Sequence, residues 1–200
     1  MNPEPTKSAV IKYRKLYDIS VVLGDQTTVY PDDSPFVLKK TMSLAAGEIA
    51  DVSELRLSAH SGTHLDLPAH FFRGSPTTES WPLEKFVLPA RVLRIRDPSS
   101  ITRRELEQKG VPEKEALLFK TANSESGLLS SGVFSEDYVS LSMEAAELCL
   151  KKKAPLLGLD CSSLDRYGDF SYPVHRKVLR NGTLILENID LKEVPEGHYT

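Results

Sequence analysis

The spacing of apolar and polar residues predicts a chain in which strands and helices interleave. Short apolar runs bounded by turn residues are typical of strands. Such runs cover residues 15–23, 36–42, 90–96, 116–120, 156–160 and 183–187. Residues 52–60 alternate between apolar and polar side chains, which predicts a half-buried strand whose polar face ends in a histidine. Most of the predicted elements are therefore strands.

Helix signals separate some of these strands. Thr102 and Glu105 form a capping box, in which the hydroxyl and the carboxylate satisfy free backbone donors. Ser142 caps a second helix that runs to about residue 153, with an inner face of Ala145, Leu148 and Cys149. A short helix is expected over residues 175–180. Because strands and helices do not alternate strictly, we expect an α/β fold with one mixed sheet rather than an all-parallel doubly wound sheet.

Composition and charge narrow the class of protein. A chain of 200 residues can form one domain with a substantial core, and we expect residues 1–200 to be a single domain that follows a polar first dozen residues without regular structure. The 25 basic and 28 acidic residues show no long block of one sign, which argues against a nucleic-acid partner. No apolar stretch suits a membrane span or a secretory signal, so we expect a cytoplasmic protein with two buried free thiols, Cys149 and Cys161.

Candidate chemistry concentrates in one segment. Three of the five histidines lie at His60, His64 and His70, with Asp66 among them. If residues 64–66 are extended, His64 and Asp66 point to the same side, which places an imidazole and a carboxylate near one ion. Nitrogen and oxygen ligands without thiolate suit Zn²⁺, Mn²⁺ or Fe²⁺. The alternative is a surface loop of hydrogen-bonded histidines, but neighbouring imidazoles disfavour each other's protonation and so leave neutral nitrogens for a cation.

The same segment resembles the cyclase family of metal-dependent hydrolases, which includes bacterial kynurenine formamidase and isatin hydrolase. The family motif is present as His60, Gly62-Thr63-His64, Asp66, Pro68 and His70-Phe71. The resemblance extends over most of the chain, through residues 16–20, 118–121, 157–160, 163–165, 174–175 and 186–187. Members usually continue past the region of residues 195–197 with a further strand and a final segment. This chain ends at Thr200, so that C-terminal segment is expected to be missing, which leaves part of the pocket wall and the sheet edge open.

The resemblance implies a site with two divalent ions close together, Zn²⁺ being expected and Mn²⁺ the alternative. His60, His64 and Asp66 would hold the first ion, and Asp66 would bridge to a second ion completed by the pair His175 and Glu187. His70 would stay off the metals as the proton-transfer group. Without the resemblance, His175 would be interpreted as a surface-helix histidine and Glu187 as a solvated strand end. A swivelling β/β/α domain and a homo-oligomer whose subunit contacts help to close the pocket are also implied.

These expectations together predict amide hydrolysis of a small molecule. A divalent ion lowers the pKa of bound water from about 15.7 towards about 7, and His70 has an ordinary pKa of about 6.5, suited to proton transfer. The leading substrate is an aryl formamide such as N-formylkynurenine. The alternatives are a cyclic amide such as isatin, or a metal-binding protein with little catalysis. Other residues fall outside this chemistry: Trp81, Phe71 and Phe72 line an aromatic pocket or pack in the core, Asp160 and Asp165 are structural, and His198 matches nothing catalytic.

Overall fold

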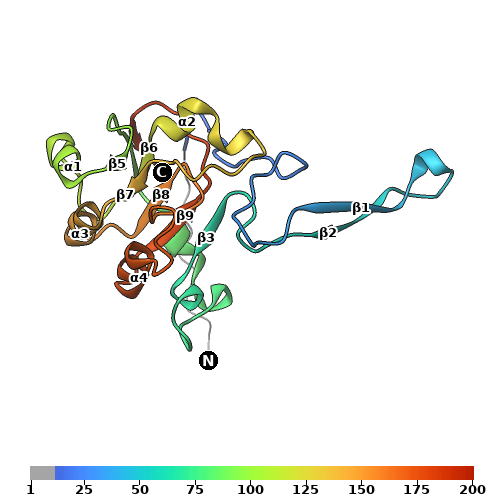
Figure 1. Ribbon diagram of the computed structural model, residues 1–200, viewed down its shortest axis with the longest axis horizontal. Coiled ribbons are helices and arrows are strands. Elements are labelled where there is room, and N and C mark those ends of the chain that lie inside the picture. The colour runs from blue at the N-terminus through green and yellow to red at the C-terminus, as the bar shows by residue number, and fades with distance from the viewer. Residues whose placement is uncertain (1–11) are drawn as a thin grey trace.

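A computed structural model describes residues 12–200, so the expectation for residues 1–11 lies outside the described part of the chain. A six-stranded mixed sheet forms its centre, in the order β10-β4-β6-β8-β9-β3 (Figure 1). The strands are β3 (His64–Asp66), β4 (Ala90–Arg94), β6 (Ala116–Lys120), β8 (Leu156–Leu159), β9 (Leu184–Glu187) and β10 (Gly197–Tyr199). The four central strands run parallel, and both edge strands run antiparallel to their neighbours. The predicted α/β class with one mixed sheet is confirmed.

Helices cover one face of this sheet. They are α1 (Arg103–Lys109), α3 (Met143–Lys151) and α4 (Pro173–Arg180). Successive residues of a strand point to opposite faces, so in β6 Leu117 and Phe119 pack under the helices while Ala116 and Leu118 join a second cluster on the other face. Burial on both faces explains why the central strands are continuous apolar runs.

Shorter elements connect these layers. A two-residue parallel pair joins β5 (Ser100–Ile101) to β7 (Ser140–Leu141), and α2 (Ala122–Ser126) follows β6. Single 3₁₀ turns lie at Leu44–Ala46, Pro68–His70, Thr78–Ser80, Leu83–Phe86 and Leu128–Ser130. None of these short elements was predicted, because each is too short to show a repeating apolar pattern, and β5 and β7 are strands only through their pairing across forty residues.

The helix ends largely follow the predicted signals. The Thr102 hydroxyl accepts the Glu105 amide at 3.3 Å and caps α1, and Gly110 ends that helix with φ 69°. The Glu105 carboxylate instead accepts the backbone amides of Arg96 and Asp97, so the reciprocal half of the capping box does not form. The predicted helix at residues 175–180 begins two residues earlier, at Pro173, because proline suits the first turn of a helix.

Two strand predictions were wrong in part or entirely. Residues 15–23 form no strand, and a single bridge joins Ser20 to Ile189. The backbone amide of Val21 donates to the Thr63 hydroxyl at 2.9 Å, and the Ile19 carbonyl accepts the Asp190 amide at 2.8 Å, so isolated hydrogen bonds rather than a continuous ladder hold this segment. The predicted strand at 52–60 is shorter, as β2 (Val52–Arg56), and pairs with β1 (Val37–Met42), the strand expected at residues 36–42.

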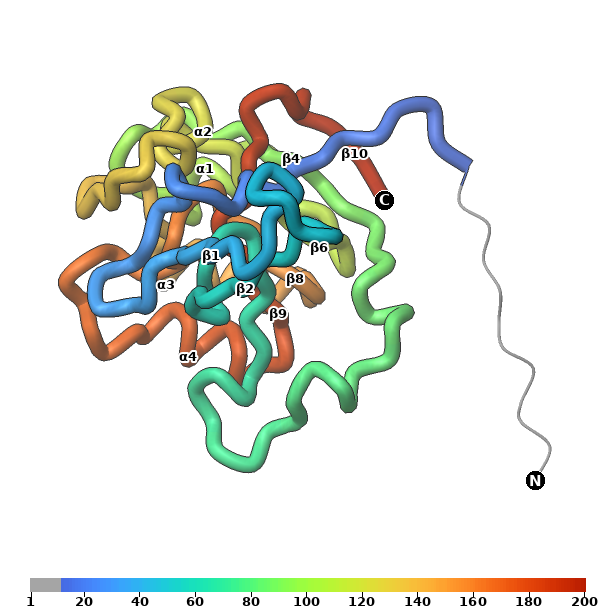
Figure 2. The backbone as a smooth tube through the Cα atoms, turned by 90° about the vertical axis from the view of Figure 1, so that its right-hand side faces the viewer, coloured from blue at the N-terminus to red at the C-terminus, as the bar shows by residue number. Residues whose placement is uncertain are grey.

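The β1–β2 hairpin projects away from the body of the molecule as an arm (Figures 1 and 2). The half-buried state predicted for β2 is therefore wrong. All five of its residues are exposed, Leu55 by 57%. The apolar and polar alternation is present, but no described element packs on the apolar side of the arm.

Several smaller predictions can also be compared with the structure. Cys149 and Cys161 are buried and unpaired, as predicted. β10 forms one edge of the sheet, next to β4. Its His198 contacts Arg91 and Glu115 at the surface. Across residues 12–200, the structure contains no helix with the length and apolar character needed to cross a membrane.

Candidate metal centre

The site forms where β3 pairs with β9, near the carboxyl end of β9. Register places His64 directly opposite Glu187. Because β3 is extended, His64 and Asp66 point to the same side of the sheet, as predicted. His60 approaches from the turn before β3, and His175 from the first turns of α4. Segments more than a hundred residues apart in the sequence thus meet at one point.

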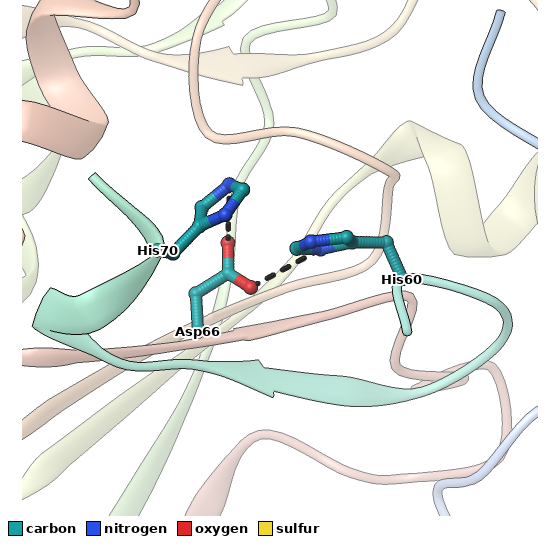
Figure 3. Close-up of side chains that lie close together, drawn as sticks. All are labelled: His60, Asp66 and His70. Atoms are coloured by element: carbon teal, nitrogen blue, oxygen red, sulfur yellow. Dashed lines mark ion pairs between the residues drawn. The ribbon is translucent and has the colours of Figure 1, made fainter. Parts of the chain in front are cut away.

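Asp66 lies at the centre of the cluster and is only 3% exposed. Its Oδ1 is 3.2 Å from His60 Nδ1 and 3.6 Å from His64 Nε2. Its Oδ2 is 3.8 Å from His70 Nε2 and also 3.8 Å from His175 Nε2. Figure 3 shows His60 and His70 turned towards different oxygens of this carboxylate. Each oxygen of Asp66 therefore faces two imidazoles.

Glu187 completes the group from the end of β9. Its Oε1 lies 2.9 Å from His175 Nε2, and its Oε2 lies 3.7 Å from His64 Nε2. The backbone amide of Leu164 donates to Oε1 at 2.9 Å, which fixes the carboxylate. Both His175 and Glu187 are 3% exposed, so the surface-histidine and solvated-strand-end alternatives are wrong. The structure brings all six predicted site residues together.

Outer hydrogen bonds orient the histidine rings. His175 Nδ1 lies 2.6 Å from Asp165 Oδ2, and the Asp165 carboxylate also accepts the amides of Val174 and His175. His64 Nδ1 lies 2.9 Å from the Gly62 carbonyl. In both rings Nδ1 is occupied and Nε2 faces the carboxylates, an arrangement typical of metal-binding histidines. The structural role predicted for Asp165 is confirmed, and it acts on the site itself.

Asn188 clamps the loop that carries the histidines, and sequence reasoning missed it. This residue adopts a left-handed conformation with φ 56° directly after Glu187. Its Nδ2 donates to the Gly62 carbonyl at 3.0 Å, and its own carbonyl accepts the Thr63 hydroxyl at 2.5 Å. Gly62 has φ 65°, a left-handed conformation that residues with a side chain rarely adopt, so the loop favours glycine there. The one available signal was an asparagine after a strand, a common turn residue.

The carboxylates and imidazoles perturb each other strongly. Burial opposes the charged form of His175, but the negative charge of Glu187 and the hydrogen bond with Asp165 raise its pKa to about 10. Burial would raise the pKa of Asp66, yet the hydrogen bond with His60 and the neighbouring imidazoles hold it below its ordinary value. Burial lowers the pKa of His70. The buried carboxylates of this centre therefore favour positive charge on the groups beside them.

The residues present fit a divalent cation. Asp66 Oδ2 is buried and has no hydrogen-bond partner among the described residues, which is costly unless a ligand satisfies it. Two groups of three potential ligand atoms each lie within 4.8 Å of one another: His60, Asp66 and His70, and His64, Asp66 and Glu187. Because His70 belongs to one group, its predicted place off the metals stays a prediction. Nitrogen and carboxylate donors suit Zn²⁺ or Mn²⁺.

A cavity of about 420 Å³ opens beside this centre. Of the three aromatic residues considered from the sequence, Phe71 lines the cavity, Phe72 packs against the helix-covered core and Trp81 packs on the opposite face of the sheet. Four further aromatic residues that the sequence did not single out also line it: Tyr30, Tyr167, Phe170 and Tyr172. Tyr167, Phe170 and Tyr172 come from the loop before α4, and the tertiary structure brings Tyr30 to them from a distant loop.

Comparison with known proteins agrees with this geometry. Residues 17–166 match the model of the Cyclase family, whose description reads "Putative cyclase". The chain belongs to the cyclase family. The resemblance drawn from the histidine motif is therefore confirmed. The matched region contains five histidine and carboxylate residues of the cluster: His60, His64, Asp66, His70 and Asp165. His175 and Glu187 follow the matched region.

Individual relatives and structures are similar over nearly the whole chain. Kynurenine formamidase from Bordetella petrii is 31% identical over 189 residues, covering 93% of this chain and 88% of the relative. The Bacillus cereus enzyme of the same name is 29% identical, covering 94% and 88%. A "predicted metal-dependent hydrolase" from Bacillus stearothermophilus superposes with a TM-score of 0.77 at 25% identity, covering 92% and 87%. Isatin hydrolase A from Labrenzia aggregata shares the fold, with a TM-score of 0.73 at 20% identity over 90% and 82%.

Proposed function

We propose that this protein is a metal-dependent hydrolase that cleaves the carbon–nitrogen bond of an aryl formamide such as N-formylkynurenine. The observation that carries the proposal is the buried carboxylate of Asp66, ringed by four imidazoles at one end of an aromatic-lined cavity. Similarity to kynurenine formamidases over nearly the whole chain supports the choice of substrate class.

We assign the metal ligands as two sets that share one carboxylate. His60, His64 and Asp66 would hold one ion, and Asp66, His175 and Glu187 would hold the other. The contacts of Asp66 agree with this division in that Oδ1 faces His60 and His64 and Oδ2 faces His175, with His70 at the same 3.8 Å from Oδ2. Zn²⁺ is the expected metal and Mn²⁺ the alternative. Divalent ions bound here would supply Lewis-acid polarisation of the amide carbonyl and would lower the pKa of a water molecule.

His70 is the proton-transfer group in this proposal. Its side chain is 37% exposed, more than that of His64 or His175, so it reaches the cavity. Burial lowers its pKa, which keeps the imidazole neutral near pH 7 and able to accept a proton. The same group can then deliver that proton to the leaving aryl nitrogen. A 3₁₀ turn over Pro68–His70 holds the ring at the edge of the metal centre.

The cavity discriminates among the alternative functions. A protein that only binds metal needs no open aromatic-lined space beside its ligands, whereas an aryl substrate does. Phe71 and Tyr172 lie with ring centroids 5.6 Å apart and form one side of that space. Cyclic amides such as isatin use the same chemistry and serve as the comparison substrate in the test below.

The test measures turnover by zinc-loaded protein and by a His70→Ala variant. Wild type should hydrolyse N-formylkynurenine at a rate proportional to its metal content. His70→Ala should keep its metal and lose about 10²–10⁴-fold in rate, the usual contribution of general acid–base catalysis. Exclusive turnover of isatin would replace the substrate class, and failure of both substrates with fully loaded protein would overturn the function. Metal loss in His70→Ala would make His70 a ligand.

We also propose that the protein is a homo-oligomer built through the β1–β2 arm. Leu38 and Leu55 are cross-strand partners on this hairpin, and both are more than half exposed. Exposed apolar groups gathered on a projecting element are typical of protein contacts. A second copy is the occupant we assign, because a two-fold axis would let each arm cover the other subunit. Sedimentation analysis of a Leu38→Glu/Leu55→Glu double variant should give a monomer, and an unchanged oligomer would exclude the arm.

A further inference from the structure

The cavity beside the metal centre has a second polar end, formed by two aspartates. We propose that Asp32 and Asp33 bind an ammonium group of the substrate, so that this enzyme prefers aryl formamides carrying a cationic amine away from the scissile bond. The inference rests on the proposed function and specifies its substrate class.

The two aspartates occupy a tight turn that follows Tyr30. The Asp33 amide donates to the Tyr30 carbonyl at 3.1 Å, and Asp32 has a left-handed conformation with φ 71°. Both residues line the same cavity as His60, His70 and Asp66. Asp33 is half-buried and Asp32 is exposed. The turn therefore presents two carboxylates at the cavity's edge.

Neither carboxylate is neutralised within the described chain. Among residues 12–200, the side chains of Asp32 and Asp33 form no ion pair or hydrogen bond, and no lysine or arginine lines the cavity. A cationic ligand group would supply the missing counter-charge.

Aromatic faces lie next to these carboxylates. The rings of Tyr30 and Tyr167 have centroids 6.2 Å apart, and those of Tyr167 and Phe170 are 5.9 Å apart. Aromatic faces attract organic ammonium groups through the ring quadrupole, and carboxylates attract them through charge. A substrate carboxylate finds no such partner here, because the cavity lining contains no lysine or arginine.

The other end of the cavity defines the direction of binding. Asp66 is 3% exposed, and its buried Oδ2, without a hydrogen-bond partner among the described residues, marks the metal end, where the scissile formamide must lie. Once cations are bound there, Asp66 and Glu187 are compensated and the remaining negative charge of the lining belongs to Asp32 and Asp33. A molecule with a formamide at one end and an ammonium group at the other thus enters in one orientation.

Calorimetric binding to zinc-loaded protein tests the subsite without requiring turnover. The probes are kynurenamine, kynurenine and 2′-aminobutyrophenone, in which a methyl group replaces the ammonium of kynurenamine. Wild type should bind kynurenamine roughly tenfold more tightly than the methyl analogue at low salt, as expected for two partly exposed ion pairs. Added salt should reduce that preference, and the extra carboxylate of kynurenine should give no tighter binding.

The variant Asp32→Asn/Asp33→Asn should remove the preference for kynurenamine while leaving binding of the methyl analogue unchanged. Asparagine tolerates the left-handed conformation at position 32, so the turn is preserved. Asp25→Asn, an exposed change in the neighbouring loop outside the cavity, is the control for loss of a nearby negative charge and should keep the preference.

The outcomes separate the subsite from the proposed function. Equal affinity of wild type for kynurenamine and its methyl analogue overturns the subsite, whether or not N-formylkynurenine is hydrolysed. A preference that survives in Asp32→Asn/Asp33→Asn also overturns it. A preference that the double variant abolishes supports the subsite even if fully loaded protein hydrolyses neither formamide, a result that would remove only the function.

Discussion

Asp66 and Asp160 are two buried carboxylates near strand ends of the same sheet, and their surroundings differ completely. Asp160 follows β8 and is fully buried. Its two oxygens accept five hydrogen bonds, from the backbone amides of Thr121 and Ser124, from both of their hydroxyls and from the Asn123 amide group. Asp66 faces only imidazoles, and its Oδ2 has no hydrogen-bond partner among residues 12–200.

The difference shows how a structural carboxylate can be told from one that awaits a cation. Asp160 uses its hydrogen bonds to tie α2 to β8, and nothing is left to bind a ligand. Burial raises its pKa, against the effect of those hydrogen bonds. At Asp66 burial acts in the same direction but the imidazoles overcome it, so the pKa falls. Burial alone does not identify a site; an unsatisfied oxygen beside other ligand atoms does.

The largest effect is expected for Asp66→Asn. This change removes the negative charge shared by both proposed ions, so both should bind more weakly and activity should fall by at least about 10³-fold. Stability of the metal-free protein at neutral pH should also fall, because the His60 hydrogen bond and the neighbouring imidazoles hold the pKa of Asp66 below its ordinary value and so stabilise its charged form in the folded state. Elemental analysis, calorimetric metal titration and thermal unfolding of the metal-free protein provide the measurements.

Glu187→Gln is the matched comparison for that variant. It should chiefly weaken the second ion, leaving about one ion per chain where wild type holds about two. A wild-type protein that saturates with one ion, with binding unaffected by Glu187→Gln, would contradict the two-ion assignment and leave His60, His64 and Asp66 as a single-metal site.

Asp160→Asn should lower the stability of the protein without changing its metal binding. Replacing one oxygen by an amide group leaves buried donors without an acceptor, which should lower the free energy of unfolding by about 2–4 kcal/mol. Urea denaturation of the metal-free proteins measures this loss. The folded variant should bind the same number of ions as wild type. Lost metal binding at unchanged stability would instead place Asp160 in the site.

A smaller effect is expected for Asp165→Asn. Asp165 holds His175 through Nδ1, and loss of such outer partners typically costs about 10–100-fold in metal affinity. Asp169→Asn, on the exposed turn before α4, is the control and should bind metal as wild type does. If competition with a chelator shows equal affinity in all three proteins, the orientation of His175 does not depend on Asp165.

Arrangements within a short stretch of chain could be predicted well. The central strands, the Ser142 and Thr102 caps and the shared face of His64 and Asp66 depend on periodicity and local hydrogen bonds. The burial of the β1–β2 arm could not be predicted in the same way. Its alternation is the pattern of a half-buried strand, but whether a surface is covered depends on partners elsewhere, and residues 12–200 supply none at that place.

The sequence by itself determined the ligand types and four of the six site residues, because His60, His64, Asp66 and His70 lie within eleven residues. The family resemblance added His175 and Glu187, which no local pattern links to that segment. Only the tertiary structure placed His64 opposite Glu187, left Asp66 Oδ2 unsatisfied and gathered Tyr30 and its neighbours into a cavity. Periodicity acts over a few residues, whereas strand register and loop packing are decided by contacts between distant parts of the chain.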